Sequence, residues 1–196
     1  TATLVHKTFM RKEGGREEAL KEARRISGIV RRAVAEGQTV SVVDGGDPTV
    51  YGPNMWFMEV FEDLSPEIVP GVSSFNAANA ALKKGVTSGE TTRSVVLTNG
   101  LDIEKLAAAR TSMVFFTMHV DVPKIVERLK PFYPPDTPVA VVVHAGFREK
   151  ERVILGMLGD IVEKTKGEKL SLYLVYVGDF LTRRYGIDLK EGGASR

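Results

Sequence analysis

Apolar residues recur every three or four positions near the start of the chain, which is the spacing of one helix face. They are Leu20, Ala23, Ile26, Ile29, Val30 and Ala33, with Arg and Lys between them. We expect a helix there that ends at Gly37, because glycine is common just beyond a helix end. The β-branched run 39–43 follows, and it predicts a short buried strand.

Further apolar positions predict two more helices in the first half of the chain. One has Pro53 as its first residue and runs to Leu64, with an apolar face packed on a sheet. A very short strand at 67–69 separates it from a helix that Ser73 or Ser74 can cap and that stops at Gly85. Ahead of these elements, we expect a short strand at 2–9 and a polar turn at 11–15.

In the second half, short apolar runs alternate with helical segments. The expected strands are 94–97, 113–118, 139–143, 152–157 and 170–177, and the expected helices are 102–110, 122–132 and 160–166. This alternation is typical of an α/β protein with buried strands. We expect two α/β lobes with mixed, largely parallel sheets, at 1–88 and 89–180, and a polar tail at 181–196. The polar connection 86–93 marks the boundary between the lobes.

The composition narrows the function classes. The chain has 196 residues, a formal net charge of +2 and no cysteine, which excludes disulfides, thiolate catalysis and cysteine zinc sites. So small a charge does not indicate nucleic-acid binding, and no apolar run approaches the roughly 20 residues of a membrane span. No signal-peptide pattern opens the chain, so we expect a cytoplasmic protein that binds neither nucleic acid nor membrane. The first residue is Thr1 rather than Met, and we expect the sequence to begin partway through a longer protein.

Two glycine-containing turns carry the candidate chemistry, at 44–52 and 69–75. Each follows an expected strand, and ligand crevices of α/β proteins lie beyond the carboxyl ends of strands. Gly45 and Gly46 allow a ligand to approach the backbone, Asp47 suits a cation or ribose hydroxyls, and the helix start at Ser73 suits a carboxylate. Such a site fits a zwitterionic amino-acid group or a nucleoside. A plain turn capped by Asp47 explains the same residues equally well.

Together the two motifs are more specific. Gly-Asp-Pro-Thr-Val-Tyr-Gly at 46–52 and Val-Pro-Gly-Val-Ser-Ser-Phe at 69–75 resemble the tetrapyrrole (corrin/porphyrin) methylase family. Further matches are 94–98, 113–116, 138–142 and 152–156, so that the resemblance runs from about residue 20 to about residue 180. Within the family, the Ser-Ser-Phe turn and the strand at 94–98 look most similar to the precorrin-4 and cobalt-precorrin-4 methyltransferases.

The resemblance implies an enzyme that transfers a methyl group from S-adenosylmethionine to a carbon of a tetrapyrrole or corrin precursor, leaving S-adenosylhomocysteine. Cobalamin or sirohaem-type biosynthesis is the implied context, and no metal is implied. Family members are commonly homodimers, and the apolar helix Met55–Phe61 is a candidate contact. They also open with a strand and a Gly-Pro-Gly-Asp loop, which no part of this sequence matches. We therefore expect an incomplete N-terminal lobe: either that segment lies outside this sequence, or the chain is a reduced relative.

The resemblance also implies site residues. Those for the cofactor are Gly45, Gly46, Asp47 and Val50, then Ser73 and Ser74, then Thr117 or Met118, and Ala145 or Gly146. Those for the substrate are Tyr51, His119 and His144, for which simple packing and plain strand-end polarity are the competing interpretations. Arg93, Arg148 and Lys150 are candidates for substrate carboxylates or for an ordinary solvated face. No catalytic residue is assigned.

Two other functions remain open at this point. In a metal-dependent sugar-nucleotide transferase, Asp44 and Asp47 would share a Mg²⁺ ion, since carboxylate oxygens are its preferred protein ligands. In a non-catalytic relative, the same turns would bind the cofactor without turnover of a tetrapyrrole.

Overall fold

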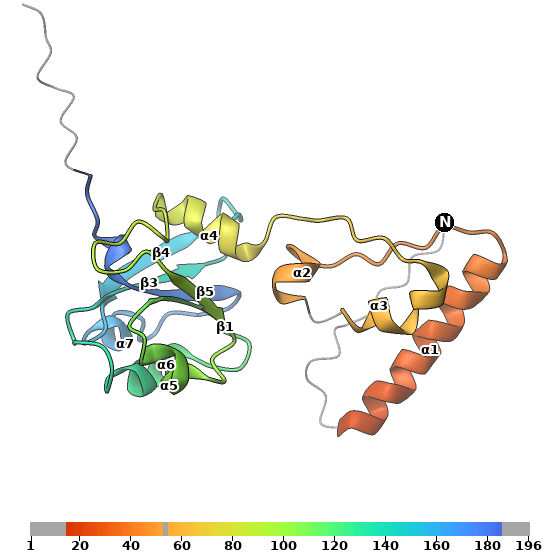
Figure 1. Ribbon diagram of the computed structural model, residues 1–196, viewed down its shortest axis with the longest axis horizontal. Coiled ribbons are helices and arrows are strands. Elements are labelled where there is room, and N and C mark those ends of the chain that lie inside the picture. The colour runs from red at the N-terminus through yellow and green to blue at the C-terminus, as the bar shows by residue number, and fades with distance from the viewer. Residues whose placement is uncertain (1–14, 53–54, 186–196) are drawn as a thin grey trace, which may run out of the picture. The chain divides into compact units, whose positions relative to one another are not determined.

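The computed structural model describes residues 15–52 and 55–185 (Figure 1). Two compact units make up the chain, Thr1–Ser73 and Ser74–Arg196. The expected strand at 2–9, most of the turn at 11–15 and most of the tail lie outside the described residues. Of the helices in the described part of the chain, none combines the length and apolarity that a bilayer span needs.

The first unit begins with the long helix α1 (Gly15–Ala35). Its end has the paired hydrogen bonds of a Schellman motif: the Gly37 N–H donates to the Val34 carbonyl at 2.9 Å, and the Gln38 N–H donates to the Ala33 carbonyl at 2.9 Å. Gly37 has the positive φ of 74° that this motif requires. The prediction that Gly37 ends the helix is confirmed.

The first unit also contains α2 (Pro48–Tyr51), α3 (Trp56–Val60) and η1 (Glu62–Leu64). Arg31 attaches α1 to the segment that carries α3 and η1. Arg31 donates to both carboxylate oxygens of Asp63, at 2.6 and 2.8 Å, and to the carbonyl of Val60 at 2.9 Å. Its guanidinium also lies 5.7 Å from the ring centre of the buried Phe61. The single helix expected before Leu64 is therefore divided into α3 and η1.

The predicted strands at 39–43 and 67–69 are wrong. Both segments are irregular, and Val43 and Val69 are 89% and 78% exposed. A strand persists only when a neighbouring strand satisfies its backbone N–H and C=O groups. Within 15–52 and 55–73 the structure describes no strand that could serve as that neighbour.

The second unit contains a five-stranded sheet in the order β1-β2-β5-β3-β4. The strands are β1 (Val95–Thr98), β2 (Ser112–Phe116), β3 (Pro138–Val143), β4 (Arg152–Met157) and β5 (Tyr173–Val177). The α/β class and the mixed sheet are confirmed. However, only β1 and β2 pair in parallel and the other three pairings are antiparallel, so the expectation of largely parallel strands is wrong. The connection from β3 to β4 is too short for the crossover that parallel pairing needs.

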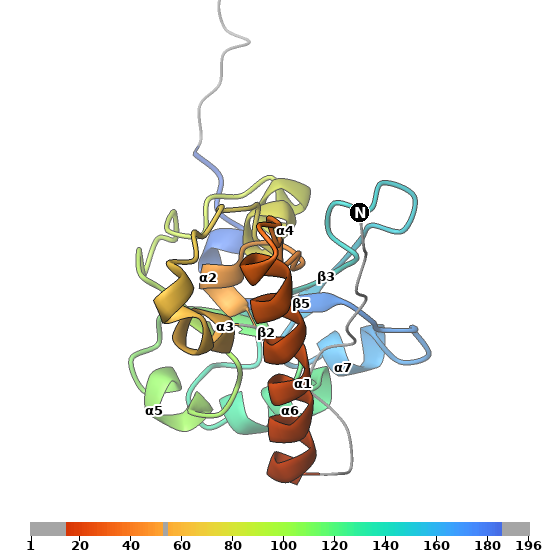
Figure 2. The same ribbon diagram turned by 90° about the vertical axis from the view of Figure 1, so that its right-hand side faces the viewer.

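Helices cover both faces of this sheet. On one face α5 (Ile103–Ala107), α6 (Val122–Leu129) and α7 (Ile161–Lys164) enclose a core whose members include Phe115, Val141 and Val175. Figures 1 and 2 show α5 and α6 side by side. On the other face α4 (Ser74–Leu82) and η2 (Asp179–Leu181) lie over β3 and β5.

The predicted lobe boundary at 88/89 falls inside the second unit. Asp179 of η2 accepts hydrogen bonds from the Glu90 N–H at 2.8 Å, the Thr91 N–H at 2.7 Å and the Thr91 hydroxyl at 2.9 Å. Burial alone would raise the pKa of Asp179, but these hydrogen bonds outweigh burial and hold it below its ordinary value. Asp179 therefore fastens the polar connection to η2 within the second unit. The division into lobes at 1–88 and 89–180 stays a prediction.

Candidate functional site

Asp47 organises the first glycine turn. Its Oδ1 accepts from the Thr49 hydroxyl at 2.6 Å and from the Thr49 N–H at 2.8 Å, which makes Asp47 the N-cap of α2, with Pro48 in the first helical position. The hydrogen bond from the Thr49 hydroxyl, followed by that from its N–H, holds the pKa of Asp47 below the ordinary value. The capping interpretation of Asp47 is thus confirmed. The cap involves only Oδ1 of the carboxylate, so Oδ2 can accept other hydrogen bonds.

The two glycine turns touch each other. The second oxygen of Asp47, Oδ2, accepts from the Gly71 N–H at 3.3 Å. A Cβ atom at Gly71 would lie 2.1 Å from the carbonyl oxygen of Gly46, closer than real atoms approach. Only glycine can therefore occupy position 71 with the turns in this arrangement, and the two motifs meet at this point.

The backbone beside this contact is accessible. A Cβ atom added at Gly45 would meet nothing within 4 Å, and Gly46 has a φ of 80° that favours glycine. Val50 is exposed in α2, whereas partial burial raises the pKa of the Tyr51 hydroxyl. Gly45 is therefore a place where a ligand can come close to the main chain.

A second group of predicted residues lies along one edge of the sheet in the second unit. Because β1, β2 and β3 run in the same direction, their carboxyl ends share this edge, and the strand registers place the start of β5 there too. The predicted residues that the structure brings to this edge are Thr117, Met118, His119, His144, Ala145 and Gly146. The hydroxyl of Thr117 donates to the Tyr173 carbonyl at 2.6 Å, which joins β2 to β5 at the edge.

The loop after β3 is held in an unusual conformation. His144 has a φ of 51°, which is uncommon for a residue other than glycine. Its N–H donates to the carbonyl of Leu172 at 2.9 Å, and its Nε2 lies 3.1 Å from the Ser171 hydroxyl. The ring of Phe147 meets the imidazole edge-on, with 6.0 Å between the ring centres. His144 is thus held from three sides.

The second glycine turn continues into the helix beside this edge. Ser74 is the first residue of α4, and Ser73 before it is buried. The hydroxyl of Tyr176 in β5 donates to the Phe75 carbonyl at 3.1 Å, and a Cβ atom at Gly146 would lie 3.8 Å from the Cβ of Ala77. The first turns of α4 are therefore attached to the sheet where β3 ends.

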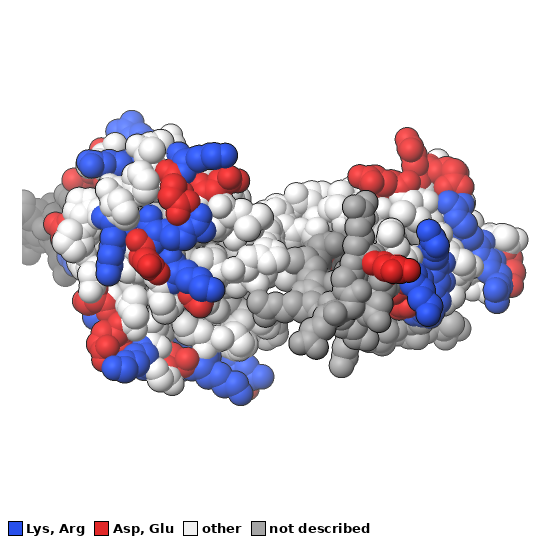
Figure 3. Space-filling model, turned by 90° about the horizontal axis from the view of Figure 1, so that it is seen from below, with Lys and Arg blue, Asp and Glu red and all other residues white. Residues whose placement is uncertain are grey.

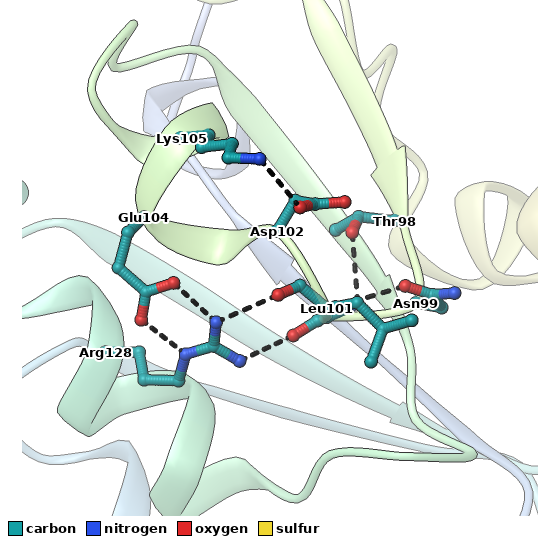
Figure 4. A network of polar contacts seen from close by, with 8 residues as sticks. Thr98, Asn99, Leu101, Asp102, Glu104, Lys105 and Arg128 are labelled. Atoms are coloured by element: carbon teal, nitrogen blue, oxygen red, sulfur yellow. Dashed lines mark hydrogen bonds and ion pairs between the residues drawn. The ribbon is translucent and has the colours of Figure 1, made fainter.

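Sequence reasoning missed the network that fixes the loop after β1 (Figure 4). Arg128 donates to both carboxylate oxygens of Glu104 at 2.5 Å, to the Gly100 carbonyl at 2.6 Å and to the Leu101 carbonyl at 3.1 Å. The Arg128 hydrogen bonds lower the pKa of Glu104 to about 2. The local signal for this turn was the Asn99-Gly100 pair directly after a strand, but nothing in the pattern pointed to Arg128.

The predicted cofactor residues thus form two groups. The glycine-turn residues Gly45, Gly46, Asp47, Val50 and Ser73 belong to the first unit, and the others to the second. A separate cavity of about 240 Å³ is lined by residues of β3, β4, α7 and η2, none of which was predicted to bind a ligand. Among the residues that the structure describes, no group of three or more His, Cys, Asp or Glu side chains could hold a metal ion. The metal-dependent alternative gains no support from Asp44 and Asp47.

The chain is similar to known proteins along most of its length. The family described as tetrapyrrole (corrin/porphyrin) methylases matches residues 2–162. The cobalt-precorrin-4 C(11)-methyltransferase of Methanocaldococcus jannaschii is 34% identical in an alignment that covers 82% of this chain and 66% of that protein. The S-adenosyl-L-methionine-dependent uroporphyrinogen III methyltransferase of Methanosarcina barkeri is 31% identical over 79% of this chain and 66% of its own length.

A solved structure agrees with these relatives. The crystal structure of a cobalt precorrin-4 methyltransferase of cobalamin biosynthesis superposes with a TM-score of 0.72 at 25% identity, covering 81% of this chain and 71% of that one. The chain spans about two thirds of the length of the two curated relatives. With the family matched over most of the sequence, the conclusion is that this chain belongs to the tetrapyrrole (corrin/porphyrin) methylases.

Proposed function

We propose that the protein is an S-adenosylmethionine-dependent C-methyltransferase that acts on a tetrapyrrole or corrin precursor, in cobalamin or sirohaem-type biosynthesis. The observation that carries the proposal is the direct contact between the Asp47 turn and the Gly71 turn. These are the two motifs on which the family resemblance rests. The names of the relatives from Methanocaldococcus jannaschii and Methanosarcina barkeri support both the reaction and the substrate class.

The residues of the first unit fit the cofactor. The open backbone at Gly45 accommodates a ligand at close range, and Asp47 Oδ2 has lone pairs left beyond its 3.3 Å hydrogen bond from Gly71. An ammonium group or ribose hydroxyls can donate to these lone pairs. When bound, S-adenosylmethionine supplies an electrophilic methyl group on a sulfonium centre. Of the second unit's residues, we propose that Ser74, Thr117, Met118, Ala145 and Gly146 complete the cofactor contacts.

Methyl transfer needs alignment more than acid–base chemistry. The methyl carbon's bond to sulfur breaks as its bond to a macrocycle carbon forms, and the macrocycle then loses a proton. The protein contributes by holding the two reactants in line and excluding water. We propose that Tyr51, His119 and His144 contact the macrocycle, and we assign the proton to no residue.

Methylation of defined macrocycles tests the function. The chain is incubated with S-adenosylmethionine and either uroporphyrinogen III or cobalt-precorrin-4, and the products are analysed by mass spectrometry. We expect the mass of one of the two macrocycles to rise by one CH2 unit for each methyl group transferred, unaffected by a metal chelator. If neither macrocycle is methylated and the chain instead turns over a sugar nucleotide only when Mg²⁺ is present, the metal-dependent alternative is favoured. Binding of S-adenosylhomocysteine without any methylated product would favour the non-catalytic one.

We further propose that the protein works in the cytoplasm as a homodimer. The absence of cysteine suits a reducing compartment. Met55 and Val60 are 37% and 36% exposed at the two ends of the apolar helix α3, which supports α3 as the contact. Sedimentation velocity is expected to give a dimer for the wild type and a monomer for Met55→Asp/Val60→Asp. A monomeric wild type would contradict this proposal and leave the catalytic one standing.

A further inference from the structure

Exposed apolar side chains gather at the sheet edge where β1, β2 and β3 end. Each of four neighbouring loops presents one: Leu101 after β1 is 65% exposed, Met118 after β2 40%, Phe147 after β3 57%, and Leu172 before β5 71%. We call these four residues the apolar rim. Moving a large apolar side chain out of water lowers the free energy. Four such side chains exposed at one strand-end edge therefore indicate a binding surface.

The loops that carry the rim are held in place by hydrogen bonds. Around Leu101, Arg128 binds two carbonyls, the Thr98 hydroxyl accepts from Gly100, and Asn99 accepts from the Leu101 N–H at 3.1 Å (Figure 4). A rim that is already ordered loses little conformational entropy when a ligand binds.

Around Phe147, three hydrogen bonds close the loop on itself. The Phe147 carbonyl accepts from the N–H groups of Lys150 at 2.7 Å and Glu151 at 2.8 Å, and the Glu151 carboxylate accepts from the Gly146 N–H at 2.8 Å. Phe147 therefore lies on a loop whose backbone is closed by hydrogen bonds before any ligand arrives.

One rim residue and a residue beside the rim also store backbone strain. His144 and Leu172 both have left-handed φ values, 51° and 49°, and they are joined by the hydrogen bond from His144 to the Leu172 carbonyl. Such residues are strained and persist where the surroundings impose the conformation, most often at binding and catalytic sites. The strain adds a second, independent observation that points to this edge.

The chemistry of the rim suits a broad, largely apolar ring system with anionic substituents. An exposed phenylalanine ring stacks well on another ring system. Next to it, the exposed cationic side chains of Arg148 and Lys150 can pair with carboxylates. The sheet order sets β1 and β3 three strand positions apart, about 14 Å, which is the scale of a small-molecule site rather than a standard protein interface.

We propose that the apolar rim is the surface on which the macrocycle lies, with Phe147 as its stacking residue. This inference rests on the proposed function. It assigns Leu101, Phe147 and Leu172 to substrate binding, in addition to Met118, for which a cofactor contact is proposed above.

Fluorescence titration with uroporphyrin III, the oxidised form of one relative's macrocycle, tests the rim in the full chain. We expect Phe147→Ala to bind the porphyrin about tenfold more weakly, Leu172→Ala to be weakened in the same direction, and Phe147→Trp to restore binding. The matched control is Leu155→Ala, since Leu155 is 59% exposed on β4 but lies away from this edge. S-adenosylhomocysteine affinity, measured by calorimetry, is expected to be the same in Phe147→Ala and the wild type.

The possible results distinguish failure of the rim proposal from failure of the proposed function. If the wild type binds the porphyrin and neither Phe147→Ala nor Leu172→Ala is weakened relative to Leu155→Ala, the rim is overturned and the proposed function stands. If the wild type binds S-adenosylhomocysteine but no porphyrin, the tetrapyrrole substrate itself is overturned, and the rim with it.

Discussion

Gly71 donates its backbone N–H to the carboxylate of Asp47, across 24 residues of sequence. The same glycine lies so close to Gly46 that a Cβ atom would be 2.1 Å from the Gly46 carbonyl oxygen. Asp47 also caps α2 through Thr49, so a single carboxylate joins a helix start to a distant turn. The arrangement of the first unit's candidate site therefore depends on the carboxylate of Asp47 and on the absence of a side chain at Gly71.

Substitution of Gly71 tests that dependence. Gly71→Ala forces the two turns apart, and we expect it to lower the free energy of unfolding by about 2 kcal/mol, the scale of an overpacked site. Urea denaturation measures the change. The matched control is Gly45→Ala in the neighbouring turn, where a Cβ meets nothing within 4 Å and stability should stay within about 0.5 kcal/mol of the wild type. Equal stability of the two variants would show that the turns are not in contact.

Tyr176 provides a second test, at the start of α4. It is fully buried, and its hydroxyl donates to the Phe75 carbonyl at 3.1 Å. Tyr176→Phe leaves that carbonyl without this donor, and we expect a loss of about 1 kcal/mol in the free energy of unfolding. Tyr185→Phe, at an exposed tyrosine, is the control and should be neutral. A neutral Tyr176→Phe would mean that this hydrogen bond does not hold α4 to β5.

The Glu104–Arg128 pair predicts a pH dependence. Arg128 lowers the pKa of Glu104 to about 2 from an ordinary value of 4.5. A group whose folded-state pKa is depressed stabilises the fold above its unfolded-state pKa, and this contribution is lost as the pH falls through the folded-state value. The wild type should therefore exceed Glu104→Gln in melting temperature at pH 7, and the difference should shrink between pH 4.5 and pH 2.

Thermal unfolding followed by circular dichroism across that range makes the measurement. Glu163→Gln is the control, since Glu163 pairs with Lys166 only at 3.4 Å with both side chains largely exposed. If the difference in melting temperature between the wild type and Glu104→Gln were the same at every pH, the stabilising role of this network would be ruled out.

The strands of the second unit could be predicted because β-branched runs such as 139–143 are buried in a sheet whichever way their neighbours run. The same signal failed at 39–43, since the pattern within a strand does not say whether a partner is present. The apolar pattern of a strand does not indicate its direction either. β5 lies antiparallel between β2 and β3, and no residue in 173–177 predicts this.

The candidate site divides in the same way. The motifs at 46–52 and 69–75 were visible in the sequence, but the hydrogen bond that joins them was not. Arg128 was not found, because it lies 27 residues from Leu101 and reaches it only through the packing of α6 beside α5. Phe147 was missed for a related reason: an aromatic residue in a loop is indistinguishable in sequence from a packing residue until its exposure is known.

The central claim is that the Asp47 turn is part of an S-adenosylmethionine site. Calorimetric titration of S-adenosylhomocysteine into the wild type, Asp47→Ala and the control Asp102→Ala tests it most directly. We expect the wild type and Asp102→Ala to bind equally well and Asp47→Ala to bind at least about tenfold more weakly, because the bridge to Gly71 and the acceptor for the cofactor are lost together. Equal, tight binding by Asp47→Ala and the wild type would contradict the account.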